Sequence, residues 1–171
     1  RKSIPGSIHT LEPRVLLTTI DLATLTAAQG STIFGADVGD WSGRSVGSAG
    51  DVNGDGFDDL LIGAPSADAS NNIKYAAGDS YVIFGGASLP TTIDPANLGT
   101  AGITIFGADA GDRSGSSVGS AGDVNGDGFD DLLIGAPCAA ASGNGKSSAG
   151  DSYVIFGGAS LPTTIDLANL G

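Results

Sequence analysis

Two identical fifteen-residue stretches, residues 51–65 and 123–137, carry most of the side chains that could do chemistry. Each stretch places side-chain oxygens at its first, third, fifth and ninth positions, and the backbone carbonyl of its seventh residue can supply another. Gly56 and Gly128, at the sixth position, permit the sharp turn that such a loop needs. The ten residues concerned are Asp51, Asn53, Asp55, Phe57, Asp59, Asp123, Asn125, Asp127, Phe129 and Asp131.

These ten residues predict a Ca²⁺ site in each loop. Hard oxygen donors in that number suit Ca²⁺ better than Mg²⁺ or a transition metal. Asp51, Asp59 and the two acids between them would repel one another unless a cation neutralised them. The alternative is a bare turn built on Asn-Gly and Asp-Gly pairs. An EF-hand is excluded because its twelfth position needs a bidentate Glu, where this chain has Ile62 or Ile134.

The composition limits the class of protein. The 171 residues include 29 Gly, and their formal net charge is −12 at pH 7. That charge argues against nucleic acid as a partner, because nucleic-acid binding needs basic patches. No apolar run approaches the roughly 18 residues of a transmembrane helix, so no membrane span is expected. Short β-branched runs separated by Gly, Ser, Thr and Asp predict an all-β protein with many turns.

Catalysis is not expected. The chain has one His, one Glu and one Cys, at His9, Glu12 and Cys138. No Ser-His-Asp set can be assembled from these residues. The clustered Asp residues, which could otherwise serve in acid–base chemistry, are accounted for by calcium. We therefore expect that the protein is not an enzyme.

A tandem duplication begins at residue 31. Residues 31–99 align with 103–171 at a constant offset of 72, and 58 of the 69 positions are identical. Some of the eleven differences lie just before the strand that leads into the calcium loop. There the first copy has Trp41, and the second copy has Arg113 at the aligned position. The others include a stretch, 66–76, that is typical of a surface loop. Trp41 is expected in the core or an interface, although an exposed Trp could stack on a sugar.

Each repeat is expected to hold four short strands. Fixed repeats with several strands predict propeller blades or another stacked array. We divide the chain into an N-terminal arm and linker (1–30), a first repeat (31–102) and a second repeat (103–171). The four strands expected around the first repeat are Ser45–Asp51, Asp59–Gly63, Asp79–Phe84 and Thr104–Gly107.

The motifs around the calcium loop resemble the FG-GAP repeat of the integrin α-subunit β-propeller. In the first copy they are Phe34-Gly35, the loop Asp51–Asp59 and the tripeptide Gly63-Ala64-Pro65, and all three recur in the second. The resemblance implies two four-stranded β-propeller-type blades with an extended N-terminal arm, and Ca²⁺ bound in each loop by the residues named above. The family uses seven blades in a ring, whereas this chain has two. An Asp-x-Ser-x-Ser metal-adhesion motif is absent, so integrin-style ligand binding is not carried over.

The N-terminal arm carries a second resemblance. Residues 11–17, Leu-Glu-Pro-Arg-Val-Leu-Leu, resemble the LEPR-XLL motif near the start of very large bacterial surface or secreted proteins. This motif implies a secreted bacterial protein located outside the cell or at its surface. The arm is also a segment that a chain could exchange with a neighbour.

Three copies of one linker, at 18–25, 91–98 and 163–170, suggest how chains associate. If the Thr-Ile-Phe-Gly strand after each linker completes the preceding blade, then Thr32–Gly35 has no blade of its own and the second blade lacks its outer strand. We therefore expect a homo-oligomer or homopolymer: a closed ring, a filament, or a window on a longer array. The first hypothesis is a calcium-stabilised structural protein that assembles head to tail into a filament or surface layer. The alternative is an adhesion module that binds a cell-surface or carbohydrate ligand.

Overall fold

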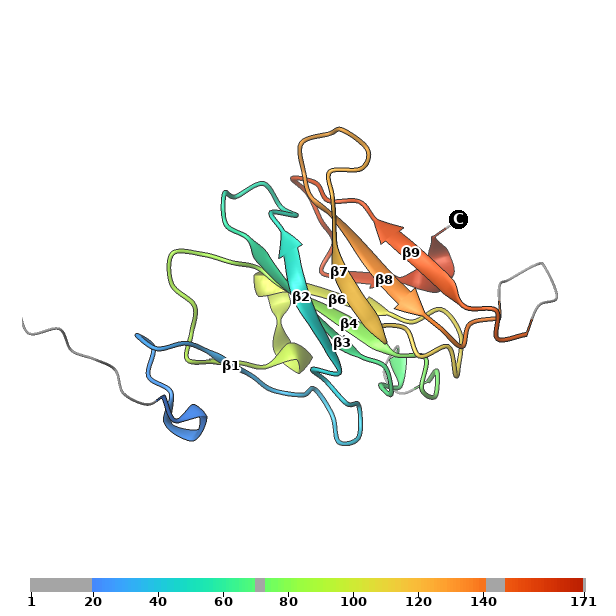
Figure 1. The fold of residues 1–171 in the computed structure, drawn as a ribbon, viewed down its shortest axis with the longest axis horizontal. Coiled ribbons are helices and arrows are strands. Elements are labelled where there is room, and N and C mark those ends of the chain that lie inside the picture. Colours follow the sequence, from blue (N-terminus) through green and yellow to red (C-terminus); the bar gives the residue numbers. More distant parts are fainter. Residues whose placement is uncertain (1–19, 70–72, 141–146, 171) are drawn as a thin grey trace, which may run out of the picture.

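The computed structural model describes residues 20–69, 73–140 and 147–170, and its elements are β-strands joined by turns and short 3-10 helices. This confirms the all-β class. Blade 1 and blade 2 are two antiparallel sheets that lie side by side (Figure 1). The strands of blade 1 are β2 (Ser45–Gly50), β3 (Asp59–Ala64), β4 (Asp79–Ile83) and β6 (Gly102–Phe106). Those of blade 2 are β7 (Ser117–Gly122), β8 (Asp131–Ala136) and β9 (Asp151–Ile155).

The outer strand of blade 1 comes from beyond the linker. Strand β6 pairs antiparallel with β4, with Thr104 opposite Tyr81, so the strand after the linker does complete the preceding blade. Four strands per blade is therefore confirmed for blade 1. Blade 2 holds three strands within the described part of the chain, ending at β9.

The linkers form short parallel strands that the sequence did not suggest. Strand β5 (Thr92–Ile93) pairs with β1 (Thr32–Ile33), and β10 (Thr164–Asp166) pairs with β6. The linker at 91–98 thus lies along β1, and the linker at 163–170 lies along β6. Three 3-10 turns follow the linker Thr-Ile-Asp sequences, because each Asp side chain accepts the N–H two residues on. The 3-10 helices are η1 (Leu22–Thr24), η2 (Pro95–Asn97), η3 (Gly99–Ala101) and η4 (Leu167–Asn169).

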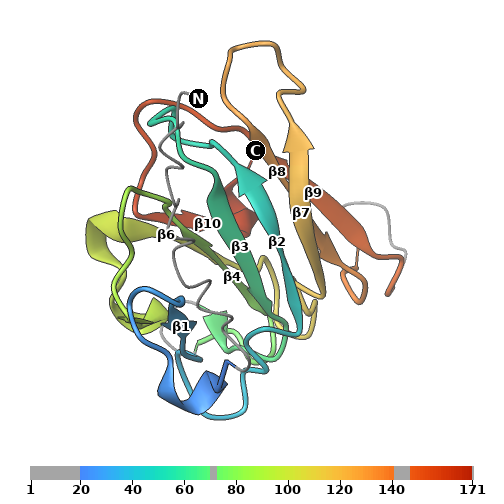
Figure 2. The ribbon, with the colours of Figure 1, turned by 60° about the vertical axis from the view of Figure 1, so that its left-hand side comes forward.

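The main core lies between the two blades. Because side chains alternate along a strand, Leu61 faces blade 2 and the adjacent Ile62 faces the other side of the sheet. Leu61 packs with Ile105 and with Ile134 of blade 2, and Figure 2 shows the two sheets against each other. No described helix is long and apolar enough to cross a membrane.

Polar contacts also join the blades. The Ser45 hydroxyl donates to the Gly115 carbonyl at 2.8 Å, and a Cβ on Gly63 would collide with that same carbonyl. Only glycine therefore permits the backbones to approach this closely. The Lys74 ammonium lies 2.8 Å from the Asp166 carboxylate, and this ion pair joins a loop of the first repeat to the linker of the second.

Identical residues in the two repeats have different surroundings. Leu61 is 0% exposed, whereas its counterpart Leu133 is 43% exposed. Val82 is 0% exposed, whereas Val154 is 44% exposed. Blade 2 covers the first pair, and among the described residues no blade covers the second. Blade 2 therefore presents to solvent the face that blade 1 buries.

A buried carboxylate lies beneath the surface of blade 1. Asp79 is 7% exposed; one of its oxygens accepts the Tyr81 hydroxyl at 3.4 Å, and Oδ1 has no hydrogen-bond partner among the described residues. Asp79 lines a cavity of about 410 Å³ together with Asp40 and Asp68. Burial, reinforced by the charge on Asp40, raises the pKa of Asp79 to about 7.

We expect the buried and exposed leucines to respond differently to truncation. Leu61→Ala removes a fully buried side chain and should lower the free energy of unfolding by about 2–5 kcal/mol. Leu133→Ala, made in the same local sequence, should lower it by about 1 kcal/mol or less in dilute protein. Urea unfolding of the two variants measures the difference. Equal losses would mean that the blades do not pack as described.

Asp79 should make stability depend on pH. In the folded chain the Asp79 carboxyl keeps its proton up to about pH 7. In the unfolded chain the same carboxyl loses its proton near the ordinary pKa of 3.8. The folded state therefore binds more protons between these values, and this contribution to stability is lost as pH rises through that window. Asp79→Asn cannot ionise, so it should raise the free energy of unfolding at pH 8 by on the order of 2–4 kcal/mol and change it little near pH 4.

Asp151→Asn is the matched control for this experiment. Asp151 holds the equivalent place at the start of β9 and is partly exposed. Its substitution should leave the pH profile of the melting temperature close to that of the wild type. A wild-type profile for Asp79→Asn would contradict the assignment.

Candidate functional site

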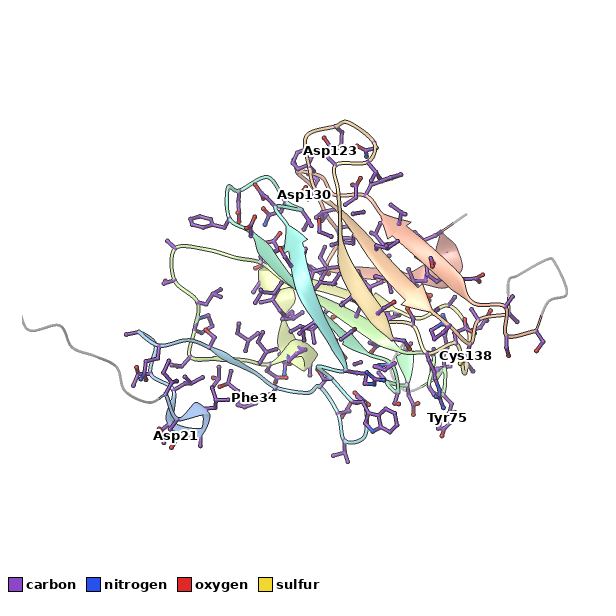
Figure 3. The ribbon with its side chains drawn as sticks, in the orientation of Figure 1. Asp21, Phe34, Tyr75, Asp123, Asp130 and Cys138 are labelled. Atoms are coloured by element: carbon purple, nitrogen blue, oxygen red, sulfur yellow. The ribbon has the colours of Figure 1, made fainter. Side chains whose placement is uncertain are left out.

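The predicted ligand residues lie in two equivalent hairpin loops at the same end of the blades. The first loop joins β2 to β3, and the second joins β7 to β8. Asp123 and Asp130 mark the second loop in Figure 3, where the first loop lies beside it. All ten residues thus gather at one end of the molecule, as two groups of five.

The first Asp of each loop organises the turn around its carboxylate. Asp51 accepts N–H bonds from Gly54, Asp55 and Gly56 at 2.8–3.0 Å. Asp123 accepts the equivalent three bonds at 2.7–3.0 Å. Gly54 and Gly56 have φ values of +76° and +88°, which glycine adopts without strain. The turn that the spacing predicted is therefore formed in both repeats.

The last Asp of each loop anchors the hairpin to its blade. Asp59 is fully buried and accepts N–H bonds from Val52 at 3.1 Å and Gly85 at 2.7 Å. Burial raises the pKa of Asp59, although these two bonds oppose the effect. Asp131 makes the same two contacts, with Val124 and Gly157, both at 2.9 Å. A nearby cation would stabilise the charged form of either carboxylate.

The donor set of each loop fits a hard cation if neutral oxygens contribute. In the described ranges, no three Asp, Glu, His or Cys side chains are grouped so that they could hold a metal ion. An ion in the first loop would therefore also need the Asn53 side-chain oxygen and the Phe57 carbonyl. Asn53 lies within the turn, where its Oδ1 accepts the Asp55 N–H at 2.9 Å. Carboxylate, amide and carbonyl oxygens together are the donors that Ca²⁺ accepts.

The two loops contact each other across the blade interface. The Asp51 N–H donates to the Asp130 carboxylate at 2.9 Å, and the Asp130 N–H donates back to the Asp51 carbonyl at 3.2 Å. A Cβ on Gly54 would meet the ring of Phe129. A change in either loop therefore reaches the other directly.

A groove of about 500 Å³ is a second candidate site, away from the calcium loops. Tyr75, on its rim, lies at the opposite end of the molecule from Asp123 in Figure 3. Most of its wall consists of positions that differ between the repeats. These lining residues, each with its counterpart where one is aligned, are Val38 (Ala110), Trp41 (Arg113), Ser66 (Cys138), Asp68 (Ala140), Tyr75 (Ser147) and Ala76 (Ser148).

Trp41 does not lie in the core, so that part of the expectation is wrong, while a place in an interface stays a prediction. Its side chain is 62% exposed, and its φ of +58° is unfavourable for a bulky residue. Tyr75, which the sequence analysis did not single out, is 77% exposed, and Arg113 reaches the same groove from the second repeat. The positions that differ between the two repeats were the signal in the sequence. If those positions are assumed to lie close together in the fold, they identify this surface.

The variable stretch 66–76 is only partly a surface loop. Ala67 and Ala69 are buried, and the Lys74 side chain is bonded to Asp166 and to the Gly107 carbonyl. Tyr75 therefore projects from a loop that its neighbour Lys74 ties to Gly107 and to the linker of the second repeat.

Comparison with known proteins identifies the repeat. The FG-GAP repeat family matches residues 42–83 and 114–155. Integrin alpha-PS2 of Drosophila melanogaster is 38% identical over 127 residues, which are 73% of this chain and 8% of that protein. Integrin alpha pat-2 of Caenorhabditis elegans is 36% identical over 142 residues, 78% of this chain and 11% of that protein. The chain thus spans about a tenth of these relatives, and it belongs to the FG-GAP repeat family, with one repeat in each of its two blades.

Proposed function

We propose that the chain is a calcium-stabilised adhesion module that acts outside the cell and binds a carbohydrate through the Trp41 groove. It is not an enzyme. The observation that carries this proposal is the groove, where residues that differ between otherwise near-identical repeats meet. Because the rest of the repeat is almost unchanged, a cluster of differences in one groove supports a role for that groove other than packing.

Calcium has a structural role in this proposal. Each loop closes one hairpin of a blade, and Asp130 of the second loop bonds to the backbone of the first. An ion bound only to the folded chain stabilises it, by about 2.7 kcal/mol when its concentration is 100 times the dissociation constant. Membership of the FG-GAP family supports a divalent cation in these loops, and the oxygen donor set favours Ca²⁺.

The relatives favour adhesion over the first hypothesis from the sequence. Those matched are integrin alpha chains, which supports a ligand-binding module at the cell surface. Assembly into a filament or surface layer finds no support among them, and neither does a bacterial source. The LEPR-XLL-like segment that suggested such a source lies outside the described residues. The division at residues 30 and 102 remains a proposal.

The chemistry of the groove suits a sugar. Exposed aromatic rings stack on the apolar face of a pyranose, and Trp41 and Tyr75 supply two such rings. Asp68 and Arg113, on the same walls, can accept and donate hydrogen bonds to hydroxyl groups. The positive φ of Trp41 is a property of the repeat, because Arg113 has nearly the same value at the equivalent place. What supports a role in binding for Trp41 is the exposure of its ring in the groove.

Chelation of divalent cations should lower the melting temperature of the chain. Asp55→Ala should reduce the calcium stoichiometry from two ions to one, and Asp127→Ala should do the same for the other loop, because each removes one ligand. Isothermal titration calorimetry counts the ions, and differential scanning calorimetry follows the melting temperature. Asp58→Asn removes a charge from the first loop without removing a ligand and should keep both ions. An unchanged melting curve in chelator would rule out the calcium proposal.

Sugar binding should be visible in the fluorescence of Trp41, the only Trp in the chain. We expect an oligosaccharide from a panel of neutral and acidic glycans to shift its emission, because stacking removes water from the ring. Tyr75→Ala should weaken that binding about tenfold or more, equivalent to about 1.4 kcal/mol. Ser147→Ala, at the equivalent place in the second repeat, should leave it unchanged. Equal effects of the two variants would exclude the groove as the site.

A further inference from the structure

We propose that the calcium site of the first loop extends across the blade interface, and that Asp130 of the second loop is a positioning residue for the ion bound in the first. The inference rests on the proposed calcium sites and adds to them a residue that is not one of their ten ligands. It concerns a contact in the interior of the chain, between residues 50–54 of the first loop and residues 129–130 of the second.

Asp130 is directed at the first loop rather than at its own. It holds the eighth position of the second loop, between the ligand positions Phe129 and Asp131. Its side chain is half-buried, and one carboxylate oxygen accepts the Asp51 N–H at 2.9 Å. Figure 3 shows Asp130 on the side of the second loop that faces the first. The carboxylate thus serves the neighbouring loop.

Asp51 is bonded at each of its polar groups once Asp130 is counted. Its carboxylate accepts three N–H bonds from its own loop. Its N–H donates to the Asp130 carboxylate, and its carbonyl accepts the Asp130 N–H at 3.2 Å. Because Asp51 is the first ligand position, fixing its backbone from outside also fixes the place of its carboxylate. A ligand that is already held in place costs less to order when the ion binds.

Glycine permits the two loops to approach this closely. Gly50 has a φ of +75°, and a Cβ at this position would collide with the Asp130 carboxylate. A Cβ on Gly54 would collide with the Phe129 ring. Residues 50 and 54 lie on either side of Asp51, so the second loop contacts the first both before and after this ligand.

Blade 2 also reaches the last ligand of the first loop. The Gly158 N–H donates to the Val52 carbonyl at 2.8 Å. Val52 in turn donates its own N–H to Asp59 at 3.1 Å. The first and last ligands of the first loop are therefore both connected to blade 2, Asp51 directly and Asp59 through Val52.

Charge favours the same role for Asp130. The first loop already holds four acids, and the Asp130 carboxylate adds a fifth beside them. Without a cation these charges repel one another, and the Asp51 N–H offsets only part of the repulsion. A cation in the first loop is attracted by all five. Asp130 therefore raises the affinity of the first loop for a cation through its charge as well as through its hydrogen bonds.

The contact acts in both directions. If Asp130 increases the affinity of the first loop for calcium, calcium in that loop strengthens the contact with Asp130 by the same factor. The first ion thus stabilises the packing of blade 2 on blade 1 as well as its own hairpin.

The test measures calcium affinity in full chains that keep one calcium site. Asp127→Ala leaves the first loop as that site. In this background, Asp130→Ala should weaken calcium binding about tenfold, the usual effect of losing a group that orients metal ligands. Asp130→Asn keeps an oxygen that can accept the Asp51 N–H and loses only the charge, so its effect should be smaller. Isothermal titration calorimetry gives the dissociation constants. An unchanged constant in Asp130→Ala would overturn the inference.

The opposite background is the first control. Asp55→Ala leaves the second loop as the calcium site, and there Asp130→Ala should change the affinity little, because the carboxylate is directed away from its own loop. A larger loss of affinity in the second loop than in the first would show that Asp130 acts within its own loop, against the inference.

Asp58→Ala is the matched control variant. Asp58 holds the eighth position of the first loop, as Asp130 does in the second, and it is exposed. In the Asp127→Ala background it removes one charge from the first loop and leaves both bonds between Asp51 and Asp130 in place. Its effect on affinity should therefore be smaller than that of Asp130→Ala. Equal effects would reduce Asp130 to a general charge and overturn the positioning role.

The stability of the calcium-free chain separates positioning from packing. If Asp130 only held the blades together, Asp130→Ala would lower the melting temperature in chelator and leave the calcium affinity of the first loop unchanged. That result would overturn the inference while leaving the proposed calcium sites intact. An Asp127→Ala chain that binds no calcium would contradict the proposed sites themselves, and the inference with them.

Amide hydrogen exchange gives a second readout across the interface. In the Asp127→Ala chain, calcium in the first loop should slow exchange of the Asp130 N–H, although this group belongs to the loop that has lost its ion. The Val124 N–H bonds to Asp131 within the second loop at 2.9 Å, so it serves as the reference and should change less. Equal slowing of the two groups would assign the effect to the whole fold and contradict the proposed contact.

Discussion

The structure depends on one strand pairing, that of β6 with β4. This pairing carries the chain from one repeat into the sheet of the previous one, so that the linker, β10 and the second blade are all positioned by it. It buries the whole of β4 and, with blade 2, the apolar side chains that face it. Among the described residues no strand pairs with the outer edge of β9, and Leu133 and Val154 on the face of blade 2 are exposed. In blade 1, the strand pairing that closes the edge of β4 and the packing that covers its face therefore occur together.

Charge sets a second constraint, because the chain concentrates acids in places where water is limited. The calcium loops distribute backbone N–H groups around Asp51 and Asp59, which offsets part of the repulsion before any cation binds. In the cavity of blade 1, Asp79 Oδ1 has no hydrogen-bond partner among the described residues, and burial raises the pKa of Asp79 to about 7. Burial raises the pKa of Asp59 too, but the two N–H bonds to its carboxylate oppose that effect. The two carboxyls thus differ in their hydrogen bonds: Asp59 accepts two backbone N–H bonds, whereas Asp79 accepts one long bond from the Tyr81 hydroxyl.

The proposed ligand site and the packing of the blades use different residues of the repeat. The groove around Trp41 and Tyr75 is lined mostly by positions that differ between the two copies. The core between the blades uses residues that the copies share, such as Leu61 and Ile134. Substitutions can therefore distinguish one surface while the packing is kept.

Sequence alone determined the features that depend on neighbours along the chain. The turn around Asp51, the hairpins it joins and the strand limits within a residue or two follow from local spacing. The calcium ligands and the repeat boundaries were named on the same ground and stay predictions. Tertiary structure decided the rest, because identical sequences met different neighbours: Leu61 is covered and Leu133 is not. It also brought Trp41, Tyr75 and Arg113 to one groove and paired the linkers in parallel with earlier strands. Contacts between residues far apart in the chain leave no period or motif in it, so only the folded chain reveals them.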